Sequence, residues 1–222
     1  MKTKFQNETF CGGPPQELNQ LHGNAKHAVL LTLEGVIRPH LSRACQELVE
    51  PIRFLPGATD GLRLLAENDF CVVAITEDAE IAPRHGFQKR PTHWAERWLM
   101  EIALRRGRVD GIYARPGSGT NWLDRAEIAG AVIRQILREL RLPAWDVHFV
   151  TDNPVDLAAA SALGCMGILL QRDAFLHTLP ANPYEPEVAS NLFQAAERIV
   201  MQRVNPLLRA VEEAAPQRSW QP

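Results

Sequence analysis

Short apolar runs alternate with longer segments of helical period along most of this chain, and this alternation restricts the fold more than any other feature. Runs rich in Val, Ile, Leu and Ala predict strands at Ala28–Leu33, Cys71–Ile75, Gly111–Ala114, Val147–Val150 and Cys165–Leu170. Segments with apolar residues three and four positions apart predict helices at Ala58–Glu67, Pro91–Arg106, Arg125–Leu140, Pro154–Leu163 and Pro186–Val204. Strands that alternate with helices form a parallel sheet, so we expect a Rossmann-like three-layer αβα sandwich.

The ends of the chain differ in composition from its middle. Residues 1–25 are polar and rich in Gly, Pro, Asn and Gln, which predicts an extended N-terminal arm. The strand and helix pattern fills residues 26–185, which we expect to form the core domain. Residues 186–222 are predicted to add a helix and a tail that pack on this core.

Charge and hydropathy exclude two classes of partner. The formal net charge is -2, and no run of Lys and Arg occurs, so we expect no nucleic-acid partner. No stretch of about 18 apolar residues occurs, so we expect no membrane span. The four cysteines are scattered and form no C-x-x-C pair, which favours reduced thiols and a cytoplasmic location. Cys71 and Cys165 lie in apolar runs and are predicted core residues.

Polar clusters follow four of the predicted strands. They are residues 32–35, 76–78, 115–117 and 151–156. Ligands of parallel α/β sheets collect at the carboxyl ends of the strands, so these clusters are the candidate functional residues. Two local interpretations remain open: Thr32 and Glu34 as ordinary strand-end residues of another α/β fold, and Asp152 and Asp156 as a helix cap and a first-turn acid.

The order of these clusters resembles the motifs of the haloacid dehalogenase (HAD) superfamily. That family has two aspartates two positions apart after the first strand, a Ser or Thr after the second, then a Lys or Arg, then an acidic pair. The segment from Thr151 to Asp156, followed by a helix of small residues, is the most specific match. Phe54-Leu55-Pro56-Gly57-Ala58 and Asp110-Gly111-Ile112-Tyr113 are similar to the sugar-phosphate and histidinol-phosphate phosphatase branch.

The resemblance implies a role for each strand-end residue. Thr32 would stand at the position of the nucleophile and Glu34 at that of the acid/base. Thr76 and Arg115 would bind phosphate, and Glu34, Asp152 and Asp156 would hold Mg²⁺. The Cys and His residues of the branch's zinc loop are missing after Tyr113, and the short stretch before Pro56 leaves no room for a large cap domain.

Thr32 is the main departure from the family pattern. A threonine hydroxyl is hardly ionised at neutral pH and needs an adjacent base, so aspartyl-phosphate chemistry is excluded at this position. Glu34 is one methylene longer than the family's aspartate, and a misplacement of about 1 Å can cost roughly a hundredfold in rate. Binding of Mg²⁺ is then expected to be weak or absent.

Three functions are compatible with this pattern. The first is a catalytically impaired HAD-like protein that acts as a binding or regulatory partner of another protein. The alternative is a magnesium-dependent phosphatase that acts on a small phosphorylated metabolite through Glu34, Asp152 and Asp156. The third is a structural subunit that docks on a partner through its two ends.

Overall fold

The computed structural model describes residues 26–40, 53–77, 93–115, 122–171 and 187–204, and a parallel sheet runs through its centre. The six strands have the order β3-β2-β1-β4-β5-β6, and every neighbouring pair is parallel. Their bounds are β1 Ala28–Thr32, β2 Cys71–Thr76, β3 Gly111–Ala114, β4 Val147–Thr151, β5 Met166–Leu170 and β6 Glu187–Ala189. The predicted αβα class is therefore confirmed.

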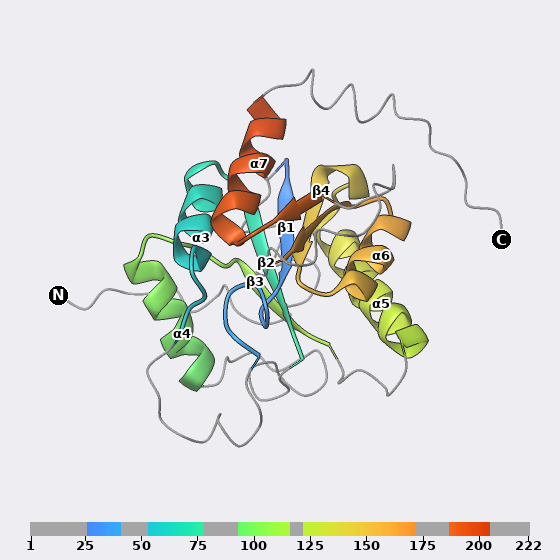
Figure 1. The fold of residues 1–222 in the computed structure, drawn as a ribbon, viewed down its shortest axis with the longest axis horizontal. Helices are drawn as coiled ribbons and strands as arrows, with labels where there is room; N and C mark the ends of the chain where they lie inside the picture. The colour runs from blue at the N-terminus through green and yellow to red at the C-terminus, as the bar shows by residue number, and fades with distance from the viewer. Residues whose placement is uncertain (1–25, 41–52, 78–92, 116–121, 172–186, 205–222) are drawn as a thin grey trace.

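Helices cover both faces of the sheet (Figure 1). Their bounds are α3 Ala58–Glu67, α4 His93–Leu104, α5 Trp122–Leu140, α6 Pro154–Ala162 and α7 Leu192–Val204, with a short 3-10 turn at Ala144–Asp146. Helices α3, α4 and α7 lie on one side of the strands, and α5 and α6 lie on the other. In the described part of the chain, no helix is long and apolar enough to cross a membrane.

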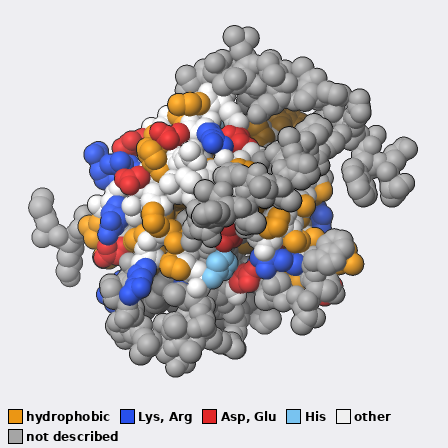
Figure 2. Space-filling model, in the orientation of Figure 1, with side chains coloured by type: hydrophobic (Ala, Val, Ile, Leu, Met, Phe, Trp, Pro, Cys, Tyr) orange, Lys and Arg blue, Asp and Glu red, His pale blue; other side chains and the backbone are white. Residues whose placement is uncertain are grey.

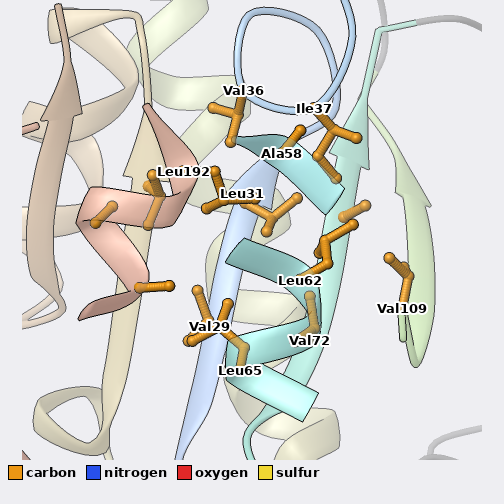
Figure 3. Close-up of a cluster of buried hydrophobic side chains, with 14 of the residues drawn as sticks. Val29, Leu31, Val36, Ile37, Ala58, Leu62, Leu65, Val72, Val109 and Leu192 are labelled. Atoms are coloured by element: carbon orange, nitrogen blue, oxygen red, sulfur yellow. The ribbon is translucent and has the colours of Figure 1, made fainter. Parts of the chain in front are cut away.

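The first strand contributes side chains to two hydrophobic cores, one on each face of the sheet. Val29 and Leu31 point into the core under α3 and α7, which Figure 3 shows, whereas Ala28 and Leu30 point into the core under α5. Successive strand residues face opposite sides, and both sides are covered, so the whole strand is apolar. Full burial of each Leu or Val side chain stabilises the fold by about 1.5–3 kcal/mol.

The two predicted core cysteines are buried and free, as expected. Burial raises the pKa of the Cys71 thiol to about 12 and that of the Cys165 thiol to about 11. Both thiols are therefore protonated at neutral pH and unreactive while the protein is folded.

One element prediction was wrong at its start. The helix expected at Pro186–Val204 begins at Leu192, because Glu187–Ala189 forms the edge strand β6. The strand pairs with β5 in the register Ile168↔Glu187, so this segment is part of the sheet. Asn191 caps the start of this helix: its side-chain oxygen accepts a hydrogen bond from the Gln194 N–H at 3.0 Å. The predicted N-terminal arm and the C-terminal tail lie outside the described residues.

Candidate functional site

A pocket lies at the carboxyl ends of β1, β2, β3 and β4, which are neighbours in the sheet. It is lined by Thr32, Glu34, His40, Ile75, Thr76, Glu77, Arg115, Arg125, Asp152 and Asp156. All six residues that the sequence singled out are in this set. The sheet brings them together because the ends of adjacent parallel strands meet at one edge.

Thr32 ends β1 and is almost fully buried. Its hydroxyl donates a hydrogen bond to the hydroxyl of Thr151, at the end of the neighbouring strand β4, over 3.3 Å. Thr151 in turn accepts the backbone N–H of Asn153 at 3.1 Å. Among the described residues, no carboxylate or imidazole is hydrogen-bonded to Thr32, so its hydroxyl has no base to activate it.

Glu34 lies in the tight turn after β1 and is held by several donors. Arg38 donates to one carboxylate oxygen from Nε at 3.2 Å and from Nη2 at 2.6 Å. The Thr76 hydroxyl donates to the same oxygen at 2.7 Å, and the Glu77 N–H reaches the other oxygen at 3.3 Å. The Thr76 hydroxyl, which the sequence resemblance assigns to phosphate, therefore serves this chain's own carboxylate.

Asp152 follows β4 and packs against the backbone of Gly35. Gly35 has φ +82, and a Cβ at this position would lie 2.0 Å from an Asp152 carboxylate oxygen. Only glycine fits this close approach, because any side chain would displace the carboxylate. The same carboxylate meets His40 Nε2 at 2.8 Å.

Asp156 is fully buried and contacts two guanidinium groups. Arg115 donates from Nη1 to one oxygen at 2.6 Å. Arg125, in the first turns of α5, donates from Nε to that oxygen at 3.0 Å and from Nη2 to the other at 2.8 Å. The two-point contact of Arg125 is the strong, planar form of this interaction.

Glu77 contacts the two arginines from the solvent side of the pocket. Its carboxylate forms ion pairs with both Arg115 and Arg125, the latter at 3.0 Å. Arg115 is 3% exposed, whereas the Glu77 side chain is 38% exposed. Two arginines are therefore sandwiched between a buried carboxylate and a partly exposed one.

The carboxylates of this pocket do not fit a resident divalent cation in the arrangement that they adopt. Glu34 faces Arg38, Asp152 faces His40, and Asp156 faces two arginines. Within the described ranges, no three His, Cys, Asp or Glu side chains are grouped as metal ligands. Mg²⁺ requires free anionic oxygens in an octahedron, whereas one oxygen of each of these carboxylates already has a side-chain nitrogen of Arg or His as its partner. The assignment of Glu34, Asp152 and Asp156 as metal ligands stays a prediction.

Sequence reasoning missed two side chains that line the pocket, Arg125 and His40, and one that contacts Glu34 beside it, Arg38. Arg38 had a usable signal, because it lies four residues after Glu34 and the tight turn between them pairs residues at that spacing. Arg125 lies in the first turns of α5, where the helix dipole favours acids over bases. No local pattern therefore predicted its contact with Asp156. His40 meets Asp152 across 112 positions of sequence, a contact that only the folded chain creates.

Comparison with known proteins gives matches to solved structures. D,D-heptose 1,7-bisphosphate phosphatase from B. bronchiseptica, complexed with magnesium and phosphate, superposes with a TM-score of 0.58 at 24% identity, over 79% of this chain and 99% of that one. The corresponding phosphatase from Burkholderia thailandensis gives 0.51 at 19% identity, with the same shares covered. No protein-family model and no curated protein sequence matches the chain.

A third similar structure is the cobalt-bound deoxy-D-mannose-octulosonate 8-phosphate phosphatase from Haemophilus influenzae. It has a TM-score of 0.50 at 15% identity and covers 82% of this chain and 90% of that one. Identities this low establish the fold and leave the activity open. The chain thus has the HAD-like phosphatase fold, close in architecture to the sugar-phosphate phosphatases, as its motif order predicts.

Proposed function

We propose that this chain is a HAD-fold protein without phosphatase activity, which uses its strand-end pocket for binding or regulation. The observation that carries the proposal is the position of Thr32. It ends the first strand, where the family places the attacking aspartate, and its hydroxyl is hydrogen-bonded to a second hydroxyl, that of Thr151. Neither group is a nucleophile at neutral pH without a base.

The charges around Thr32 support the same proposal. Phosphoryl transfer is catalysed by cations aimed at the charge that develops on the transferred group. Here the guanidinium groups of Arg115 and Arg125 are directed at Asp156 and Glu77, and that of Arg38 at Glu34. These cations neutralise the chain's own carboxylates and are not aimed at a transferred phosphoryl group.

The partner of such a protein is another protein or a small phosphorylated molecule. The formal net charge of -2 does not favour nucleic acid or an anionic lipid surface as partner, and on the face shown in Figure 2 the described Lys and Arg side chains are interspersed with Asp and Glu side chains. The free, buried Cys71 and Cys165 are compatible with a reducing compartment, and we place the protein in the cytoplasm.

A turnover assay tests the proposal. The purified chain is incubated with Mg²⁺ and either p-nitrophenyl phosphate or a panel of sugar phosphates, and phosphate release is compared with that of an Asp152→Ala variant. We expect equal, background rates, because no nucleophile is present to be assisted. Magnesium-dependent release by the wild type that disappears in Asp152→Ala would instead establish the phosphatase alternative.

A further inference from the structure

Helix α4 carries apolar residues on both of its sides. Trp98 and Ile102 point into the core and are almost fully buried. Met100 and Leu104 lie one turn apart on the outer side, where they are 57% and 71% exposed, and the exposed Ala103 lies beside them. A helix that is apolar all round is normally covered on both sides. We call Met100, Ala103 and Leu104 the α4 face.

The outer side of α5, on the other face of the sheet, differs from the α4 face. In the second half of α5 the exposed residues are Ala131, Arg134, Gln135 and Arg138, and three of these four are polar. Such a side is stable in water without a partner. Large apolar residues that are exposed singly are also normal on a protein surface. The α4 face differs from both cases, because its two large apolar side chains are neighbours on one helix.

Three exposed arginines border the α4 face. Arg97 lies one turn before it, and Arg105 and Arg106 follow it. No carboxylate among the described residues pairs with any of the three, and the Arg105 guanidinium carbon lies 5.5 Å from the centre of the Phe54 ring. Glu101, on the same helix, is only partly exposed. The guanidinium groups of Arg97 and Arg106 can therefore pair with carboxylates from outside the chain.

The charge around the α4 face favours an acidic partner. Residues 93–106 contain three arginines and two glutamates, so this segment is positive in a chain whose formal net charge is -2. Met and Arg are both enriched in the interfaces of protein complexes. An amphipathic helix with Glu or Asp beside its apolar residues would cover Met100 and Leu104 and would also neutralise the arginines.

Two other occupants complement the α4 face less well. In a two-fold contact between copies of this chain, centred between Met100 and Leu104, Arg97 of one copy would lie opposite Arg106 of the other, and these like charges repel. An anionic lipid surface would attract the arginines but repel Glu101, which lies in the same turn as Met100. The partner that fits both the apolar pair and the arginines is a segment of another protein.

We propose that the α4 face binds an acidic amphipathic helix of another protein, with its apolar stripe on Met100 and Leu104 and its carboxylates on Arg97 and Arg106. Helix α4 lies beside α3, away from α7 (Figure 1). It leads from the carboxyl end of β2 to the amino end of β3, so Leu104 lies toward the end of the sheet away from the strand-end pocket. The inference goes beyond the proposed function and does not depend on it.

Fluorescence anisotropy of a labelled peptide, titrated with the full chain, tests the inference. The probe is a designed helix of about 18 residues, or five turns, with Leu at every third and fourth position and Glu beside each Leu. A second peptide has Lys in place of Glu. We expect the Glu peptide to bind at least about tenfold more tightly than the Lys peptide, because the arginines attract one and repel the other.

Two pairs of variants locate the site through its apolar residues. Met100→Ser/Leu104→Ser should weaken binding of the Glu peptide at least about tenfold, since the area that the peptide buries is no longer apolar. Leu123→Ser/Met201→Ser is the matched control, because these side chains are 58% and 62% exposed but lie on α5 and α7. The control should bind as the wild type does, and thermal unfolding of each variant reports whether it is folded.

A second pair of variants isolates the charge. Arg97→Gln/Arg106→Gln removes two positive charges beside the α4 face and should weaken binding at least about fivefold, with a smaller dependence on salt. Arg134→Gln/Arg138→Gln removes the same charge from the exposed side of α5 and should leave binding unchanged.

Four results would overturn the inference. They are absence of binding of the Glu peptide to the wild type, equal losses in the α4 variants and in their controls, sedimentation with anionic phosphatidylglycerol vesicles that Met100→Ser/Leu104→Ser abolishes, and dimers in analytical ultracentrifugation that the same variant dissociates. The third result would assign the α4 face to a lipid surface, and the fourth would assign it to a second copy of the chain.

Discussion

Two buried aspartates lie at opposite ends of the sheet, and different groups compensate the charge of each. Asp110 precedes β3 at the amino end, accepts the Val72 N–H at 2.8 Å and pairs with Arg108 at 2.8 Å. Asp156 lies at the carboxyl end and meets the guanidiniums of Arg115 and Arg125. Asp110 thus meets a partly exposed arginine and a peptide N–H, whereas Asp156 holds two guanidinium groups, one of them buried. The first arrangement lies at the end of the sheet away from the pocket, and the second lines the pocket.

The largest expected effect is the loss of stability when each aspartate becomes asparagine. Asp156→Asn leaves the buried Arg115 facing a second guanidinium, so we expect a decrease of about 3–5 kcal/mol in the free energy of unfolding. Asp110→Asn keeps an acceptor for Val72, and the partly exposed Arg108 can return to water, so we expect a decrease of only about 1–2 kcal/mol. Urea unfolding of both variants measures the difference.

The same decrease in the free energy of unfolding for both variants would contradict this difference between the two aspartates. Equal losses would mean that Arg108 is as dependent on its aspartate as Arg115 is. A smaller loss in Asp156→Asn than in Asp110→Asn would contradict the greater dependence of the buried Arg115 on its aspartate.

The sheet and the place of the site were predictable from the sequence, but the partners within the site were not. Strand runs such as Gly111–Ala114 follow from apolar pattern alone, and parallel pairing then places Thr32, Thr76 and Asp152 at one edge. The three-residue strand Glu187–Ala189 is too short to show an alternating pattern, so it was merged into a helix. The contacts of Arg125 depend on how α5 packs, which no local pattern encodes.

The next effect concerns pH at the amino end of the sheet. Burial, and to a smaller extent the Asp110 carboxylate, raises the pKa of the Cys71 thiol from 9.0 to about 12. The unfolded chain loses this proton near pH 9, whereas the folded chain keeps it up to about pH 12. Stability from this thiol is therefore full below pH 9 and is lost as the pH rises toward 12, by about 1 kcal/mol at pH 10.

Urea unfolding between pH 8 and pH 10 measures this loss, and variants separate its causes. Cys71→Ala should show a shallower decline than the wild type, since Cys165, whose pKa burial raises to about 11, contributes equally to both proteins. Asp110→Asn should lie between them, because removing the carboxylate lowers the pKa of Cys71 in the folded state. A decline that is identical in the wild type and Cys71→Ala would show that this thiol is not part of the pH dependence.

The smallest expected effect on stability belongs to Glu77. In Glu77→Gln, Arg115 and Arg125 keep Asp156, and the lost ion pairs lie at the partly exposed mouth of the pocket, so the free energy of unfolding should fall by less than about 1 kcal/mol. Added salt should reduce this difference, because it screens exposed charges more than buried ones. Urea unfolding at low and high NaCl measures both quantities. If Glu77→Gln instead lost as much stability as Asp156→Asn, Glu77 would contribute to the cluster as much as the buried aspartate does. A small, salt-dependent loss in Glu77→Gln beside a large loss in Asp156→Asn would show that burial, more than the number of ion pairs, decides what a carboxylate contributes at this end of the sheet.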